Sequence, residues 1–314
     1  MTGASGFIGK LLTNELLRQG YVVRVAVRSS TGIVNNNVEL VTLGEISGVN
    51  DWLMALNNVN VVIHLAARVH VMNDKSIDPL VEFRKVNVDG TLNLARQAAQ
   101  TGVKRFIFIS SIKVNGELTS EGKPFTEGDV SNPQDAYGIS KLEAEQGLLQ
   151  IAQQTGMEVV IIRPPLVYGP NVKANFASML KAVKQGIPLP LGAINNKRSF
   201  IYVENLVSFI ILCVQHPLAT NQIFLVSDGY DLSTTELLRE CALALGVNSR
   251  LIPVPQKVLE VIAHMLGKRD VVQRLCGNLQ VDITKARTLL GWMPPISVSE
   301  GLKRTAANLR KIIN

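Results

Sequence analysis

The chain has 314 residues, of which 46% are hydrophobic and 18% are charged, and this composition excludes an intrinsically disordered protein. The net charge of +7 favours anionic small molecules, but the basic residues are scattered among acids and aromatic residues make up only 5%. A nucleic-acid groove lined by stacking aromatic side chains is therefore excluded. Apolar runs such as "FIILCV" at 209–214 are too short to span a bilayer.

The chain begins with "MTGASGFIGK", in which Gly3, Gly6 and Gly9 have the spacing of a phosphate-binding loop. This loop occupies the place of a secretory signal, so we expect a cytoplasmic protein. A loop of this kind follows a central β-strand, yet only Met1 and Thr2 precede it. Because a sheet with a truncated central strand would lose much of its stability, we expect about five further apolar residues upstream of Met1.

Short apolar runs rich in Val and Ile alternate with longer helical patterns in the first half of the chain. Nearly continuous hydrophobicity is typical of parallel strands that are covered on both faces. The alternation predicts a doubly wound α/β domain, a Rossmann fold. The expected strands are 21–27, 38–43, 59–65, 105–110 and 158–163, and the expected helices are 7–18, 52–56, 80–101 and 136–155.

The composition changes after Arg163, where long stretches rich in Pro, Gly and Asn predict loops. One further strand is expected at 221–229, and a capping box formed by Ser233 and Glu236 predicts a helix that ends at Leu245. We assign the dinucleotide-binding domain to 1–165 and about 200–228, and a smaller, mainly helical substrate lobe to 166–199 and 229–314.

The sequence predicts no metal site. Cys213, Cys241 and Cys276 lie far apart among apolar neighbours, and we expect them to be reduced core residues. No cysteine or histidine pair has the spacing of metal ligands. The four histidines are interpreted as packed or surface side chains.

Three motifs occur in a characteristic order: "TGASGFIG" at 2–9, "SS" at 110–111 at the end of a strand, and "YGISK" at 137–141. In this order they resemble the extended short-chain dehydrogenase/reductase family, particularly its nucleotide-sugar epimerases and reductases. The likeness covers essentially the whole chain. It is extended by "HLAA" at 64–67, "RPPLVYGP" at 163–170 and "KRSFIYVENL" at 197–206.

Tyr137 and Lys141 are four residues apart, so they share one face of a helix. An ammonium group beside a phenol favours the phenolate, and we therefore expect Lys141 to lower the pKa of Tyr137 and make it a general acid or base. The resemblance implies that Ser111, rather than Ser110, binds the reacting sugar oxygen, and that Lys141 also holds the nicotinamide ribose. It gives Asn87 a structural role.

The resemblance also implies a nicotinamide cofactor whose pyrophosphate lies against the glycine loop. Where NAD-binding relatives carry an acid, the chain has Arg28, Ser29 and Ser30. A guanidinium suits a 2′-phosphate, which favours NADP, although an arginine stacked on adenine is also compatible with NAD. The implied cofactor-binding residues are Gly3, Gly6, Phe7, Ile8, Gly9, Arg28, Glu45, Ile46, Leu65, Ala66, Ala67, Tyr137, Lys141 and Pro164.

The substrate implied by the resemblance is a UDP-sugar. Arg198 matches the phosphate-binding arginine of the family. A guanidinium suits this role because it makes forked contacts with a diphosphate. Leu166 departs from the family pattern where an asparagine often approaches the sugar diphosphate. The expected substrate contacts are Ser111, Asn175, Leu189, Arg198 and Arg269, with Arg274 as the alternative to Arg269.

The cofactor preference bears on the reaction. NADPH is the usual cellular reductant, so a preference for NADP favours a reductase that acts on the 4-keto form of a UDP-hexose. This hexose includes N-acetylated and 6-deoxy sugars, and the expected use of the product is surface polysaccharide. The alternative is a UDP-glucose or UDP-N-acetylglucosamine 4-epimerase with tightly bound NAD, and an alternative of another class is a noncatalytic NADP-sensing protein. A 4,6-dehydratase is excluded because Ile112 and Lys113 replace its Asp-Glu pair.

Members of this family commonly form homodimers, here through 80–101 and 136–155.

Overall fold

The computed structural model describes residues 1–29, 37–69, 78–172, 174–267 and 269–313. Its centre is a parallel sheet in which β2 and β1 form one part and β3, β4, β5 and β8 the other, in that order. The doubly wound fold is therefore confirmed. The strands are β1 (Arg24–Val27), β2 (Glu39–Thr42), β3 (Val61–His64), β4 (Arg105–Ile109), β5 (Glu158–Arg163) and β8 (Gln222–Leu225).

Met1 and Thr2 join the two parts of the sheet. Thr2 forms parallel bridges with Ala26 of β1 and His64 of β3. The Ala26 N–H donates to the Met1 carbonyl at 2.8 Å, and the Thr2 N–H donates to the Ile63 carbonyl at 3.1 Å. The two residues before the glycine loop thus lie between β1 and β3, where the central strand of such a sheet belongs.

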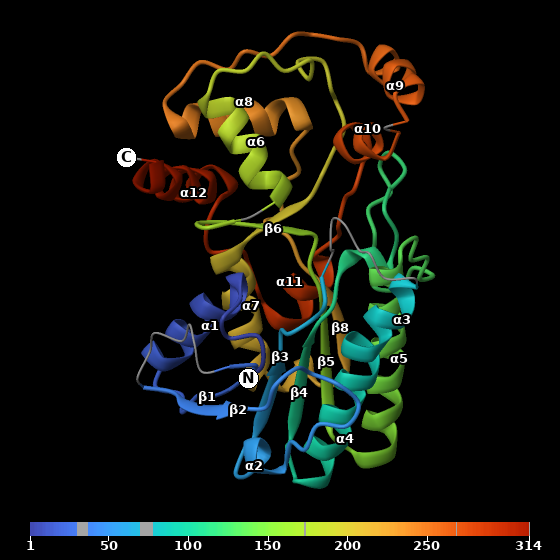
Figure 1. The fold of residues 1–314 in the computed structure, drawn as a ribbon, viewed down its shortest axis with the longest axis vertical. Coiled ribbons are helices and arrows are strands. Elements are labelled where there is room, and N and C mark those ends of the chain that lie inside the picture. The colour runs from blue at the N-terminus through green and yellow to red at the C-terminus, as the bar shows by residue number, and fades with distance from the viewer. Residues whose placement is uncertain (30–36, 70–77, 173, 268, 314) are drawn as a thin grey trace.

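Helices cover both faces of the sheet (Figure 1). Ile107 and Ile109 of β4 face a core shared with α1 (Phe7–Arg18), α7 (Val203–Gln215) and α11 (Thr284–Leu290). Phe106 and Phe108 face the opposite core, shared with α4 (Thr91–Gln100), α5 (Ala136–Thr155) and the neighbourhood of α2 (Leu53–Leu56). Burial on both faces explains the unbroken apolar runs of the sequence.

The helix expected at 80–101 is correct in extent but not in type. It consists of α3 (Pro79–Arg84), a π-helical segment η1 (Lys85–Gly90) and α4, in direct succession. Asp78 caps its start by accepting from the Leu80 N–H at 3.0 Å. Local π-helix is frequent at functional sites, and this segment packs against α5.

A second lobe lies beyond the carboxyl ends of the strands (Figure 1). Its core includes Tyr168, Tyr202 and Leu238, and the predicted capping box of Ser233 and Glu236 is present. The division of the chain into two domains at the stated boundaries stays a prediction. The remaining elements are β6 (Leu166–Tyr168), β7 (Phe200–Tyr202), α6 (Ala174–Lys184), α8 (Thr234–Leu245), α9 (Gln256–Met265), α10 (Arg269–Cys276), α12 (Val298–Ile313), and the 3₁₀ turns η2 (Ile112–Val114) and η3 (Pro217–Ala219).

Among the described residues, no helix has both the length and the apolar character needed to cross a membrane. The three cysteines are buried and unpaired, as the sequence predicted.

Candidate active site

The glycine loop connects Thr2 to α1 and packs against the end of β3. Gly3 has a φ of +71°, and a Cβ built on it would lie 2.8 Å from the Ala66 nitrogen. A Cβ on Gly9 would lie 2.1 Å from the Gly3 carbonyl oxygen. Side chains at these two positions would separate the loop from α1 or from the 65–66 segment, so glycine is required at both.

The first turn of α1 is open to an anion. Gly6 is its N-cap, and no side chain makes a capping hydrogen bond there. The Gly6 N–H donates to the Gly3 carbonyl at 3.0 Å, which closes the loop beneath the helix end. An uncapped helix start with a narrow glycine cradle provides backbone N–H groups for a phosphate, so these residues fit the pyrophosphate of a dinucleotide.

His64 fixes the segment that faces this loop. Its Nδ1 lies 2.7 Å from the Thr2 hydroxyl and its Nε2 lies 3.0 Å from the Thr91 hydroxyl. The Thr2 hydroxyl in turn accepts from the Ala66 N–H at 3.2 Å. Burial lowers the pKa of His64 to about 3, with the charge of Lys141 acting in the same direction. His64 is therefore a neutral packed side chain, as the sequence interpretation held.

Tyr137 and Lys141 lie side by side on α5. The Lys141 Nζ is 5.9 Å from the centre of the Tyr137 ring, donates to the Ile109 carbonyl at 2.8 Å, and sits 4.3 Å above the Phe108 ring. Gly138 allows this turn of the helix to approach η2, because a Cβ there would lie 2.9 Å from the Lys113 carbonyl oxygen. The pair is thus held at the carboxyl end of β4.

The expectation that Lys141 lowers the pKa of Tyr137 is wrong for these side chains. Burial raises the pKa of the Tyr137 phenol, and the Asp135 carboxylate raises it further. Burial also lowers the pKa of Lys141 to about 7, so its ammonium carries only part of its charge at neutral pH. The lysine donates to the Ile109 carbonyl, and burial of the phenol is the largest cause of the shift in the pKa of Tyr137.

The two serines after β4 differ in environment. Ser111 is half-buried and caps η2, accepting from the Lys113 N–H at 3.2 Å. Ser110 is buried, and its hydroxyl has no hydrogen-bond partner among the residues that the structure describes. Both serines directly precede η2, and η2 packs against α5, the helix that carries Tyr137. The assignment of the catalytic hydroxyl to Ser111 stays a prediction.

The residues expected around adenosine lie along the ends of β1, β2 and β3. Arg28 and Glu45 are exposed, and Ser30 is outside the described residues. Ile46 packs beneath the π-helical segment, where a Cβ on Gly90 would lie 2.5 Å from its Cγ2 atom. The other expected cofactor residues that are half-buried at this edge are Gly3, Phe7, Ile8, Leu65, Ala66 and Ala67, whereas Pro164 is buried.

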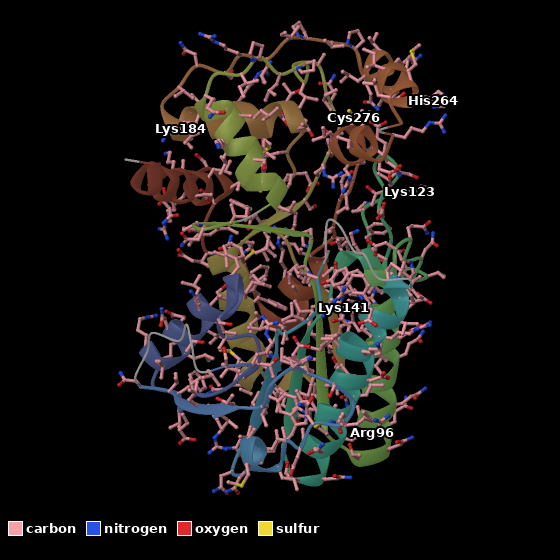
Figure 2. All side chains as sticks on the ribbon, viewed as in Figure 1. Arg96, Lys123, Lys141, Lys184, His264 and Cys276 are labelled. Atoms are coloured by element: carbon pink, nitrogen blue, oxygen red, sulfur yellow. The ribbon has the colours of Figure 1, made fainter. Side chains whose placement is uncertain are left out.

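Apart from Ser111, which follows β4, the expected substrate contacts belong to the second lobe. Arg198 is half-buried and donates to the Gly277 carbonyl at 3.0 Å, and burial lowers the pKa of its guanidinium. Leu189 exchanges backbone hydrogen bonds with the 250–252 segment. Arg269 is exposed and lies 3.0 Å from the ring of His264, a residue that Figure 2 shows at the outer end of the lobe and away from Lys141. The side chain of Asn175 is outside the described residues.

Comparison with known proteins identifies the family. Residues 1–227 match the model of the NAD dependent epimerase/dehydratase family. The chain belongs to this family. The resemblance to extended short-chain dehydrogenases and reductases is thereby confirmed.

Two curated members of the family and one solved structure are similar over nearly the whole chain. The UDP-glucose 4-epimerase of Vibrio cholerae is 50% identical over 308 residues, which cover 98% of this chain and 93% of that protein. The N-acetyl-alpha-D-glucosaminyl-diphospho-ditrans,octacis-undecaprenol 4-epimerase of Escherichia coli O157:H7 is 28% identical over 319 residues, with 97% and 93% covered. The crystal structure of UDP-glucose 4-epimerase with UDP-glucose from Thermotoga maritima has a TM-score of 0.79 and 27% identity, covering 100% of this chain and 98% of that chain.

A charged cluster that the sequence did not predict lies beside Tyr137. Lys113 of η2 forms an ion pair with Asp135, the residue that caps α5, and lies 3.2 Å from Glu117. The sequence identifies Lys113 only as a residue that replaces an acid of the dehydratases. Its partner is two residues before Tyr137, which was the available signal.

A buried ion pair beneath the site was also missed. Arg163 at the end of β5 binds Glu145 of α5 at 2.5 Å, with side chains that are only 4% and 2% exposed. Arg163 also donates to the Asn115 side chain at 2.9 Å, directly after η2. In the sequence, the feature that could have indicated this ion pair is a charged residue at the end of an apolar strand. The network ties together β5, α5 and η2, which carry or position the candidate catalytic residues.

Asn87 connects the π-helical segment to the same site. It accepts from the Arg68 N–H at 2.8 Å and donates to the Ser140 hydroxyl at 3.0 Å. These contacts hold η1 against α5 and are consistent with the structural role implied for this residue.

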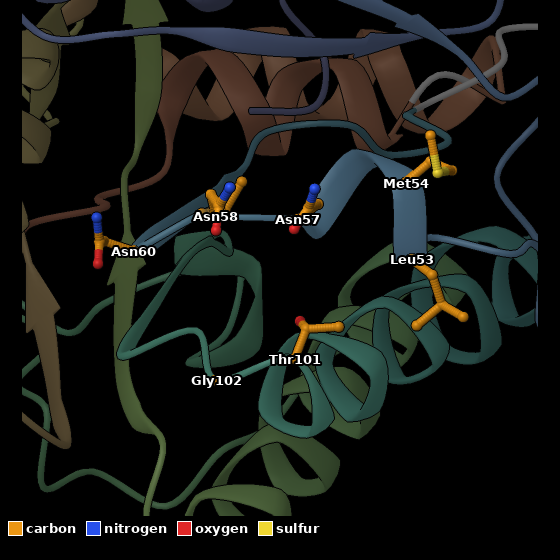
Figure 3. Close-up of a pocket in the computed structure, with 8 residues that line it drawn as sticks. Leu53, Met54, Asn57, Asn58, Asn60, Thr101 and Gly102 are labelled. Atoms are coloured by element: carbon orange, nitrogen blue, oxygen red, sulfur yellow. The ribbon is translucent and has the colours of Figure 1, made fainter.

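A surface hollow is found at the opposite end of the sheet (Figure 3). It lies beside the amino ends of β3 and β4, whereas ligands of open α/β sheets bind at the carboxyl ends. No titratable side chain lines it, and we do not assign it to catalysis. Its lining residues are Leu53, Met54, Asn57, Asn58, Val59, Asn60, Thr101 and Gly102.

Proposed function

We propose that the protein is an NAD-dependent 4-epimerase of a UDP-hexose. The observation that carries this proposal is the Tyr137 and Lys141 pair, held on α5 at the carboxyl end of β4, together with the glycine loop that packs against the end of β3. The family is described as NAD dependent, and its Vibrio cholerae member at 50% identity is a UDP-glucose 4-epimerase. Oxidation and reduction at a sugar carbon require a group that transfers a proton and a binding site for a dinucleotide.

The residues have distinct roles in this mechanism. Tyr137 in its phenolate form accepts the proton of the 4-hydroxyl when C4 is oxidised and returns it when the carbonyl is reduced, and Ser111 donates a hydrogen bond to the same oxygen. Lys141 supplies a partial positive charge next to the phenol, and the start of α1 with Gly3 binds the pyrophosphate. A nicotinamide held at this site would supply the hydride chemistry at C4. Arg198 is the residue we assign to the diphosphate of the substrate.

The comparisons favour epimerisation over the 4-ketoreductase prediction. That prediction depended on NADP, and NADP depended on Arg28 with Ser29 and Ser30, of which Ser30 is outside the described residues. The description of the matching family, NAD dependent epimerase/dehydratase, supports NAD. We therefore replace the preference for NADP with NAD, and the 4-keto reduction remains an outcome of the test below.

The identity of the sugar is a further part of the proposal. We propose UDP-glucose or UDP-N-acetylglucosamine, with a product used for surface polysaccharide. A cytoplasmic location fits this proposal, because UDP-sugars and nicotinamide cofactors are available there. Homodimerisation through 80–101 and 136–155 stays a prediction.

One incubation series tests the proposed function. The full-length protein is given UDP-glucose, UDP-N-acetylglucosamine or a UDP-4-keto-6-deoxy sugar, each with and without NADPH. We expect interchange of the C4 isomers without any added reductant. Product that forms only with stoichiometric NADPH would establish a ketoreductase instead, and nucleotide binding without turnover of any sugar would establish a sensor.

A further inference from the structure

Helix α9 turns an apolar stripe toward solvent. Val258, Val261, Ile262, Met265 and Leu266 recur at intervals of three and four residues, and their exposed fractions range from 46% to 81%. Ala263 is the one buried residue of this helix. An amphipathic surface helix normally packs its apolar stripe against the core. Packing within the fold therefore does not explain why the apolar stripe of α9 faces solvent.

The stripe lies at an extremity of the molecule. Figure 1 shows α9 and α10 at the outer end of the second lobe, far from the sheet. The two helices pack against each other, and α10 leads directly into Gly277, the hydrogen-bond partner of Arg198. The stripe on α9 is therefore linked through α10 and Gly277 to Arg198.

Basic residues border the stripe. At 100° per residue, Lys257 and His264 lie next to each other along one edge of α9, and Arg269 bonds to His264 at 3.0 Å. Between 250 and 276 the sequence has five lysines and arginines against two acidic residues, Glu260 and Asp270. The edge that Lys257, His264 and Arg269 form beside the stripe is thus positively charged.

This charge decides among the possible occupants. A second copy of the chain, packed stripe to stripe across a two-fold axis, would bring two basic borders together. An anionic lipid surface instead accepts both the apolar stripe and the basic border, since lysine and arginine reach the headgroups while apolar side chains enter the acyl boundary. We propose that α9 docks the protein on an anionic membrane surface.

Vesicle flotation of the full-length chain tests this proposal without reference to turnover. We expect the protein to float with vesicles of phosphatidylcholine mixed with phosphatidylglycerol, to bind pure phosphatidylcholine more weakly, and to lose binding as salt is added. Met265→Asp should weaken binding by about tenfold or more, because it places a charge in the apolar stripe. Lys257→Gln should weaken binding to the anionic vesicles only.

Met54→Asp is the matched control. Met54 is 79% exposed and Met265 is 81% exposed, but Met54 lies on α2 at the opposite end of the molecule. It should bind vesicles like the wild type, and both variants should keep the wild-type melting temperature because neither side chain is buried. Absence of flotation with anionic vesicles, or equal binding by the two variants, would overturn the proposal. So would a dimer that Met265→Asp converts into monomers, which would make α9 a self-association surface.

Discussion

Tyr137 is influenced by charges from two different elements. Its own helix contributes Lys141 and the capping residue Asp135, and η2 contributes Lys113, which pairs with Asp135 and contacts Glu117. From α3, the group that reaches it is the Phe83 ring, edge-on at 6.0 Å. Asp135 raises the pKa of the phenol, so the pairing of Asp135 with Lys113 limits that effect.

A pair of substitutions tests this balance. Lys113→Gln leaves the Asp135 carboxylate without its partner, which raises the pKa of Tyr137 and moves the acid limb of the kcat/KM profile upward by about 0.5–1 pH unit. Asp135→Asn removes the charge and keeps a competent helix cap, so it should move the limb downward. Lys123→Gln, at an exposed position, is the control and should not move it. A shift in the same direction for both Lys113→Gln and Asp135→Asn would contradict the account.

At the scale of residues, the sequence predicted that Tyr137 and Lys141 lie close together, but it did not predict the directions of their pKa shifts. The four-residue spacing correctly placed Tyr137 beside Lys141. The sign of the pKa shift depends on how deeply both groups are buried and on the Ile109 carbonyl, which comes from another element. Helical spacing carries no information on either.

At the scale of elements, α5 carries two ion pairs that differ mainly in burial. Glu145 pairs with Arg163 in the interior, and Glu143 pairs with Arg84 at the surface, with side chains 30% and 44% exposed. A surface pair is worth little because water screens it, whereas removal of one partner from a buried pair leaves an uncompensated charge.

Glu145→Gln should therefore cost about 3–5 kcal/mol of unfolding free energy, because Arg163 would keep its buried charge. Glu143→Gln, two residues away on the same helix, should cost less than about 1 kcal/mol. Urea unfolding of both variants gives the comparison. Equal losses would show that the interior network does not brace α5 against β5 and η2.

The elements themselves were mostly predictable from periodicity, because β4 and β5 are apolar throughout and α1 and α5 have clear starts. The π-helical segment was not. A single extra residue per turn leaves the apolar pattern of 80–101 nearly unchanged, and the contacts that favour it, such as Asn87 with Arg68, come from a distant loop.

At the scale of the whole molecule, the burial of Lys141 links stability to pH. Its pKa is about 7 in the folded chain, against an ordinary value of about 10.4 when exposed. The unfolded chain therefore holds a proton that the folded chain holds less tightly. This penalty on folding is fully present below about pH 7 and disappears as the pH rises toward 10.4.

Lys141→Met removes the penalty along with the ammonium. The variant should gain stability relative to the wild type near pH 7, by about 2–4 kcal/mol more than it does near pH 10. Chemical unfolding at the two pH values measures this, with Lys123→Met as an exposed control that should show no such dependence. A difference between variant and wild type that is independent of pH would mean that Lys141 is not buried as a desolvated amine.

The doubly wound architecture was predictable from the alternation of strands and helices, but the shape of the second lobe was not. Its contacts join segments far apart in sequence, such as Arg198 with Gly277 and Leu189 with the 250–252 segment. Loop-rich sequence has no periodicity to predict such pairings. The exposed stripe of α9 was likewise invisible, because a sequence pattern shows that a helix is amphipathic and not which way its apolar side faces.

The account depends most on the phenol of Tyr137, and the rate of C4 isomer interchange by Tyr137→Phe tests it directly. With UDP-glucose and the full-length protein, we expect kcat to fall by about 10²-fold or more while bound NAD stays at the wild-type level. Tyr230→Phe, which alters an exposed tyrosine, should keep the wild-type rate. A Tyr137→Phe protein that interconverts the isomers as fast as the wild type would contradict the assignment of this site.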